Sequence, residues 1–278
     1  MGTGPSFGAE HGAVEDPVLK RALLRLMPGK RRHALLGAIR GVRYRGDAVE
    51  CPCCDGSFAR FLPHRGRMHA KCPGCGALER HRLLWLFLQR ETDLFTGGAL
   101  LHIAPEYTFL RRFSQTSGLH YVTGDIDSAL ASHRIDVMDI PFPAESFDFL
   151  LCNHVLEHVE DDRLALAEIQ RVLKPGGWAI LMCPVDHRQL TTLEDPTIVT
   201  PADRHRAFGQ GDHVRLYGRD YPRRLEGAGF EVRVDRYLDG FDEGSIGRFG
   251  LRREEDEAFG SEEVFLCTKP SRPERAGS

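Results

Sequence analysis

Four cysteines stand in two pairs whose spacing is typical of a metal site. Cys51 and Cys54 form one C-x-x-C pair, Cys72 and Cys75 form the other, and seventeen residues separate the pairs. Each pair has a proline after its first cysteine and a glycine close behind, which suits a tight turn whose backbone amides point at thiolate sulfur. The pattern predicts a structural zinc site that holds together a module too small for its own core.

Other chemistry remains open for these residues. The cysteines could form disulfides, which a cytosolic chain disfavours, and Cys53 could replace a neighbouring ligand, although its offset is wrong for the turn. His64 and His69 lie between the pairs, so a catalytic zinc with an imidazole ligand and an open position is also consistent with the sequence.

Positive charge is concentrated around this module. Residues 17–90 contain 16 lysines and arginines against 4 acidic residues, whereas residues 91–278 contain 21 against 33. Such asymmetry fits an anionic partner for the basic part, or docking of the basic part on the acidic part of the same chain.

Helices flank the module, and strand and helix signals alternate after residue 97. Basic helices broken at Pro28-Gly29 are expected within residues 17–46, and a bridging helix within 77–96. Apolar segments at 99–104, 119–127, 146–155 and 178–185 are predicted to be strands. Residues 161–177 are predicted to be an amphipathic helix with an aspartate cap and a Pro-Gly-Gly stop. This alternation predicts an α/β fold with a doubly wound, mostly parallel sheet.

The last third departs from that alternation. A helix and a strand over 221–238 are followed, after a loop that shows no helix signal, by a final strand within 262–270. The last two strands should therefore be antiparallel neighbours.

One segment is similar to a known family. Residues 136–181 contain D-V-M-D-I-P-F-P-A-E-S-F-D, then V-L-E-H, then L-K-P-G-G. This segment resembles the core of class I S-adenosylmethionine-dependent methyltransferases of the type-11 group, and the cysteine-containing front resembles a bacterial subset of them. The resemblance implies a seven-stranded sheet with a reversed last strand, and S-adenosylmethionine as the cofactor.

The chain can then be divided along its length. We expect a flexible leader over 1–16, a basic helical segment over 17–46 and a zinc-ribbon-like module over 47–76. The bridging helix occupies 77–96, the methyltransferase domain 97–270 with an insertion or lid near 186–220, and a flexible tail 271–278.

The resemblance assigns cofactor roles to acids that follow the strands. Asp125, which closes the second strand, would bind the ribose hydroxyls; a turn or helix cap is the other reading of this residue. Asp136 would face the adenine amino group, and Val137 would offer its backbone and an apolar contact to the ring. Asn153 and His154 follow the fourth strand, where the family lines the methyl-transfer point, whereas His158 is expected to cap or pack.

The first loop breaks the family pattern of acid-x-Gly-x-Gly. His102 stands in the acidic position, and Ala104 and Glu106 stand in the glycine positions. Either the cofactor site has decayed, or Glu106 supplies the carboxylate that faces the cofactor's ammonium group. We prefer the second interpretation because the other expected positions, including Asp125, are intact.

The insertion holds the candidate substrate residues. Asp212, His213, Arg215 and Tyr217 fall within six residues, and an extended backbone would turn the last three to one side. His213 is the leading candidate for a proton acceptor, with His154 second. Arg215, Tyr217 and Asp212 would contact the substrate, although a surface hairpin with solvated charges is the alternative.

These observations favour methyl transfer to a small molecule or saccharide, at oxygen or nitrogen. An RNA base methyltransferase that uses the basic front is the first alternative, and a non-catalytic cofactor-binding or scaffold protein the second. No apolar run approaches the about 20 residues of a membrane span, and the N-terminus lacks a secretory layout. A soluble, cytoplasmic protein is expected, and its oligomeric state is left open.

Overall fold

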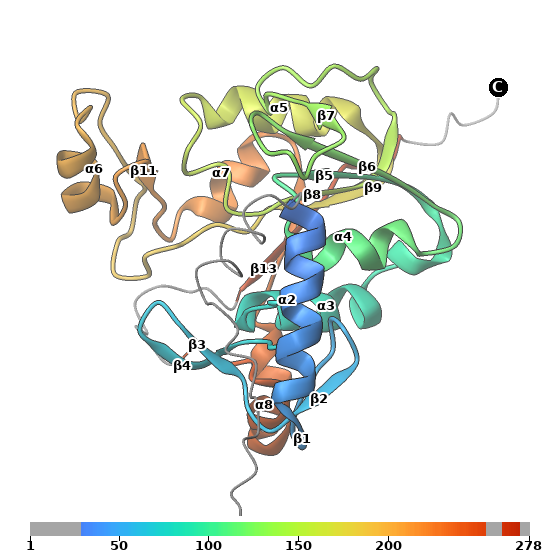
Figure 1. Ribbon diagram of the computed structural model, residues 1–278. Helices are drawn as coiled ribbons and strands as arrows, with labels where there is room; N and C mark the ends of the chain where they lie inside the picture. The colour runs from blue at the N-terminus through green and yellow to red at the C-terminus, as the bar shows by residue number, and fades with distance from the viewer. Residues whose placement is uncertain (1–28, 254–262, 273–278) are drawn as a thin grey trace, which may run out of the picture.

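Figure 1 shows the chain as a computed structural model that describes residues 29–253 and 263–272. The expected leader 1–16, the first basic helix and the end of the tail 271–278 lie outside the described residues. Within those residues, no helix is both long and apolar enough to cross a membrane.

A seven-stranded sheet lies at the centre of the main domain. The strand order is β12-β13-β9-β8-β5-β6-β7. The bounds are Gly98–Ile103 for β5, Leu119–Asp125 for β6, His133–Arg134 for β7, Phe147–Cys152 for β8, Leu173–Ile180 for β9, Glu231–Asp235 for β12 and Val264–Thr268 for β13. Strands β9, β8, β5, β6 and β7 pair in parallel, and β13 is antiparallel to both of its neighbours. The predicted mostly parallel sheet with a reversed last strand is confirmed.

Two expectations about the order of helices and strands were wrong. The Pro-Gly-Gly stop lies inside β9, which starts at Leu173, because the chain passes directly from helix into strand there. Helix α8 (Glu243–Phe249) lies between the last two strands, where no helix was expected, and a 3-10 helix, η2 (Tyr237–Gly240), precedes it. Helix α8 begins after Asp242, whose carboxylate accepts from the Ser245 amide, and ends at Gly250 with φ of 57°, so both of its ends carry ordinary capping signals.

Alternating residues of the strands face two hydrophobic layers. Leu101, Leu150 and Cys152 face one layer, which also contains residues of α5 (Asp162–Val172) and α7 (Tyr221–Gly227). Leu100 and Leu151 face the other layer, which contains residues of α3 (Glu79–Glu91) and α4 (Tyr107–Ser114). A short 3-10 helix, η1 (Leu94–Thr96), connects α3 to β5. The helices therefore cover both faces of the sheet.

Helix α3 is buried on more than one side. Leu84 and Trp85 pack against the sheet layer, whereas Leu83 and Leu86 pack with Leu238 and Ile246 of η2 and α8. A helix that is apolar around most of its circumference lies inside a protein, which explains its run of consecutive large apolar residues. The bridging helix is thus a central element.

The front of the chain consists of α2 (Gly29–Arg43) and two small antiparallel sheets. Strands β1 (Arg45–Cys51) and β2 (Gly56–Phe58) form one sheet, and β3 (Leu62–His64) and β4 (Arg67–Lys71) form the other. Figure 1 shows β1 and β2 at the opposite end of the molecule from α5.

The insertion near 186–220 forms a separate lobe beside the sheet (Figure 1). It contains α6 (Pro201–Phe208) and the strands β10 (Leu193–Glu194) and β11 (Arg215–Leu216), which pair with each other. A bridge between Val185 and Tyr217 connects the lobe to the end of the central sheet.

Candidate active site

The four predicted cysteine ligands lie together. The sulfurs of Cys51 and Cys75 are 3.6 Å apart, those of Cys54 and Cys72 are 3.7 Å apart, and all four lie within 4.8 Å of one another. Four thiolates at about 2.3 Å from one zinc ion in a tetrahedron would be separated by about 3.8 Å. Backbone amides also turn inward, since the Cys75 amide donates to the Cys72 sulfur. These residues fit a zinc ion.

Glu106 lies at the carboxyl end of β5, directly before α4. Its Oε2 lies 2.5 Å from Nε2 of His102, and the other ring nitrogen of His102 lies 2.9 Å from the Tyr121 hydroxyl. Burial would raise the pKa of Glu106, but the charge and hydrogen bond of His102, with further attraction from Arg80, lower it to about 2. Glu106 is therefore a carboxylate, and His102, fully buried with both ring nitrogens engaged, holds it in place.

Ala104 occupies a left-handed backbone conformation. Its φ is 50°, and its amide donates to the Gly124 carbonyl across the β5–β6 edge. Few non-glycine residues adopt this conformation, which costs roughly 1–2 kcal/mol. The loop after β5 thus keeps a backbone shape that normally requires glycine.

The acids after the other strands close turns of their own. Oδ1 of Asp125 accepts from the amides of Asp127 and Ser128, and Oδ1 of Asp136 accepts from the Met138 amide. Each carboxylate keeps its second oxygen without a hydrogen bond to the described residues. Val137, the predicted neighbour of the adenine ring, is buried in the hydrophobic layer that contains α5 and α7.

Asn153 and His154 lie where β8 ends, as the sequence places them. Asn153 is buried, and its Oδ1 accepts from the Met182 amide, but its Nδ2 has no hydrogen-bond partner among the described residues. His154 has a φ of 55°, and its Nε2 is likewise unpaired. Buried polar atoms without partners are rare in proteins, so these two fit a site that receives a polar ligand.

Sequence reasoning missed three residues here. Arg80 and His81, at the start of α3, lie near enough to Glu106 to shift its pKa or be shifted by it. The His81 Nδ1 accepts from the Leu78 amide, while its Nε2 and the Arg80 Nε have no hydrogen-bond partner among the described residues. Glu157 is the third, with Oε1 at 3.6 Å from Nδ1 of His154.

The hydrogen-bonding groups of the site match those of S-adenosylmethionine. Its methionine end carries an ammonium and a carboxylate and its ribose two hydroxyls. Glu106 and Asp125 offer carboxylate acceptors, while Arg80 and Asn153 offer donors for which the described residues provide no partner at Nε and Nδ2. The residues present therefore suit the cofactor, including at the loop that lacks glycines.

The candidate substrate residues of the insertion lie in different environments. His213 is buried at the edge of the site, and its Nδ1 donates to the Phe208 carbonyl at 3.2 Å. Burial lowers its pKa, so the imidazole is neutral near pH 7. Asp212 is largely exposed and lies 3.5 Å from Nδ1 of His158.

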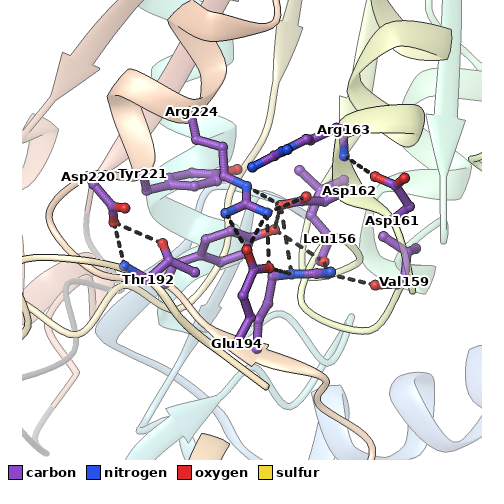
Figure 2. Close-up of polar contacts among 12 residues, drawn as sticks. Leu156, Val159, Asp161, Asp162, Arg163, Thr192, Glu194, Asp220, Tyr221 and Arg224 are labelled. Atoms are coloured by element: carbon purple, nitrogen blue, oxygen red, sulfur yellow. Dashed lines mark hydrogen bonds and ion pairs between the residues drawn. The ribbon is translucent and has the colours of Figure 1, made fainter. Parts of the chain in front are cut away.

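Arg215 and Tyr217 are buried in a network that joins the insertion to the main domain. Arg215 donates to the carbonyls of Leu156 and Val159 at 2.6 Å each, and the Tyr217 hydroxyl donates to Asp162 at 2.7 Å. Figure 2 shows Arg224 between Asp162 and Glu194 at the centre of this network. The polar groups of Arg215 and Tyr217 are thus used within the protein.

A separate cavity of about 830 Å³ lies between α2, the cysteine module and α4. Its lining includes Ala38, Phe58, Tyr107 and Arg111, but none of the residues between β8 and α5. It is therefore not the predicted methyl-transfer point.

Part of the sequence is similar to known methyltransferases. Residues 99–181 match the family model of a methyltransferase domain. Ajmaline N-methyltransferase of Rauvolfia serpentina is 30% identical over 106 residues, which are 35% of this chain and 36% of that protein. The 2-phytyl-1,4-naphtoquinone methyltransferase of Synechococcus elongatus is 37% identical over 76 residues, which are 25% of this chain and 33% of that protein.

The chain thus spans about a third of the length of these two curated relatives. Among solved structures, the YcgJ protein from Bacillus subtilis aligns with a TM-score of 0.45 and 16% identity over 69% of this chain and 100% of its own. An S-adenosylmethionine-dependent methyltransferase from Mesorhizobium loti aligns with a TM-score of 0.46 and 16% identity over 67% and 98%. Glu106, Asp125 and Asn153 all lie within the residues that match the model of this methyltransferase domain.

Proposed function

We propose that the protein transfers the methyl group of S-adenosylmethionine to an oxygen or nitrogen of a small-molecule or saccharide acceptor. The observation that carries this proposal is the grouping of Glu106, Asn153 and His154 at the ends of β5 and β8, inside residues 99–181. When bound, the cofactor supplies an activated methyl group, so the protein mainly has to align the acceptor with it.

Each residue then has a role in binding or proton transfer. Glu106, fixed by His102, would accept from the ammonium group, and Asp125 would accept from the ribose. Arg80 would donate to the carboxylate. His154 and His213, which have unpaired Nε2 atoms at the site, would take the proton of a hydroxyl or protonated amine.

A structural zinc ion at the four cysteines belongs to the same proposal. The Thr108 hydroxyl of α4 donates to the Cys75 sulfur at 3.5 Å, and α3 starts four residues after Cys75. The ion would therefore support both helices that flank the cofactor loop.

RNA is the second candidate acceptor, because positive charge is concentrated in residues 17–90. Binding to RNA would weaken steeply as salt rises, since phosphate contacts release counterions. Filter binding with total RNA between low and high salt tests this candidate, and salt-independent or absent retention would exclude it.

One experiment tests the activity as a whole. Cell extract incubated with the protein and methyl-labelled S-adenosylmethionine is examined by mass spectrometry for labelled products. A labelled metabolite or sugar supports the first candidate, and labelled RNA the second. Cofactor binding by calorimetry without any labelled product would instead support a non-catalytic cofactor-binding protein.

A further inference from the structure

Three side chains from two distant segments converge beside the proposed methyl-transfer point. Glu157 and His158 follow β8, His213 comes from the insertion, and one ligand atom of each lies within 4.8 Å of the others. We propose that these three residues form a second metal site, which binds a divalent transition-metal cation and is distinct from the four cysteines.

The unpaired atoms of this cluster are the first support. Glu157 is 2% exposed and His213 is 3% exposed. Oε2 of Glu157 and Nε2 of His213 have no hydrogen-bond partner among the described residues. Leaving a buried carboxylate oxygen and a buried imidazole nitrogen unpaired is costly. A cation placed between them would satisfy both.

The proton positions of the histidines are the second support. Nδ1 of His213 lies 3.2 Å from the Phe208 carbonyl, and Nδ1 of His158 lies 3.3 Å from the Asp212 carbonyl. A carbonyl only accepts, so each Nδ1 carries the proton and each Nε2 keeps its lone pair. Histidines that bind metals commonly donate their other ring nitrogen to a carbonyl in this way.

The backbone around the cluster is firmly held. Arg215 donates to the carbonyls of Leu156, Val159 and Glu160 on either side of the two ligands. The Val214 amide, next to His213, donates to the Glu157 carbonyl at 2.9 Å. These bonds attach the insertion to the segment after β8, and so they position all three ligands before any metal binds.

The donor set indicates which cation fits. Two imidazoles and one carboxylate suit zinc and neighbouring transition metals, whereas magnesium and calcium prefer oxygen ligands alone. Three protein ligands also leave at least one coordination position open. His154, at the proposed transfer point, lies beside this cluster, with its Nδ1 3.6 Å from Glu157 Oε1.

The role of the cation rests on the proposed function, although its binding does not. An acceptor oxygen at the open position would lose its proton more easily because the cation stabilises the resulting anion. His213 would then be a metal ligand, and His154 would be left as the group that takes the proton.

The test counts metal in the full-length protein. Wild type, Glu157→Gln, His213→Asn and the control His205→Ala are dialysed in parallel against zinc, cobalt or manganese salts and then analysed for bound metal. His205 lies on α6 of the same insertion and is exposed. We expect Glu157→Gln and His213→Asn to hold one equivalent less than wild type, and His205→Ala to match wild type.

Two further measurements distinguish loss of the second metal site from unfolding and from failure of the proposed function. Cobalt at the cysteines gives intense thiolate charge-transfer absorption, which should be equal in all four proteins, so that a variant that loses both signals is identified as unfolded. Binding of S-adenosylmethionine is measured in the same samples, so that failure of the proposed function is seen separately. Equal metal content in wild type and the two folded ligand variants, with each of the three metals, would overturn the second site.

Discussion

Nε2 of His102 lies 2.5 Å from Oε2 of Glu106, and the opposite nitrogen of the same ring lies 2.9 Å from the Tyr121 hydroxyl. The histidine thus connects a residue of β6 to the carboxylate that begins α4. In this arrangement the residue in the family's acidic position supports an acid that stands four residues later.

Removal of the Glu106 charge should weaken cofactor binding. In Glu106→Gln the amide keeps the size of the side chain but loses the negative charge, which we expect to raise the dissociation constant of S-adenosylmethionine by about tenfold or more, since hydrogen bonds to charged groups contribute ~1.5–3 kcal/mol. Isothermal titration calorimetry measures the change. Glu145→Gln, in a partly exposed turn after the residues of the proposed adenine site, serves as the control, and an unchanged constant in Glu106→Gln would remove its proposed role.

Loss of the metal bound by the cysteines should also weaken cofactor binding. Chelation, or Cys72→Ser, would release the turn before α3 and so misplace Arg80. We expect a lower melting temperature together with weaker cofactor binding, measured by calorimetry on the same samples. Cys267→Ser, which changes a buried cysteine of β13 away from the module, controls for loss of a thiol. Full cofactor affinity in a metal-free protein would contradict this connection.

His81 should make folding stability depend on pH. Burial, and secondarily the charge of Arg80, lower its pKa from 6.5 to about 3. The unfolded chain therefore takes up a proton below pH 6.5 that the folded protein does not. The stabilisation is complete above pH 6.5 and is lost as the pH falls toward 3, with a slope of about 1.4 kcal/mol per pH unit for one proton.

Urea unfolding of wild type and His81→Asn at several values between pH 7 and pH 4.5 measures this effect. Asparagine retains an acceptor for the Leu78 amide but has no titrating group. We expect the difference in unfolding free energy between the two proteins to shrink as the pH falls. Parallel pH curves for the two proteins would show that His81 is not the group responsible.

Asp162 should be essential to the attachment of the insertion. It is 1% exposed and receives bonds from Tyr217 and Arg224, both at 2.7 Å. Asp162→Asn removes the buried partner of Arg224, which then keeps only the partly exposed Glu194. Removal of one partner of a fully buried pair costs about 3–5 kcal/mol, so we expect a loss of stability below that range. Asp161→Asn is the matched control because asparagine caps a helix about as well as aspartate. Denaturant unfolding should separate the two variants, and equal stabilities would contradict the prediction.

The sequence predicted those parts of the molecule whose signals are local. The spacing of Cys51, Cys54, Cys72 and Cys75 predicted their clustering, and the alternation of strands and helices predicted the sheet. Helix α8 was not predicted because it has only seven residues, two of which are glycines. Its signals were the caps, Asp242 and Gly250, and not its periodicity.

The parts that could not be predicted depend on packing between distant segments. Arg80 and His81 approach Glu106 only because α3 is enclosed between the sheet and η2 with α8. Alternation could place Arg215 and Tyr217 on one side of a strand, but not show that this side faces the segment after β8. Glu157 was not predicted, because in the V-L-E-H motif only its neighbour His158 was considered as a site residue.

Arg82 has a consequence for the order in which the protein can be completed. This fully buried guanidinium donates to the carbonyls of Ala70 in the cysteine module and Ala77 directly after it, and to those of Phe249 and Gly250 at 2.7 and 2.6 Å. The ribosome synthesises the module about 170 residues before the latter two carbonyls. The hydrogen bonds of this guanidinium can therefore be completed only when nearly the whole protein has been made.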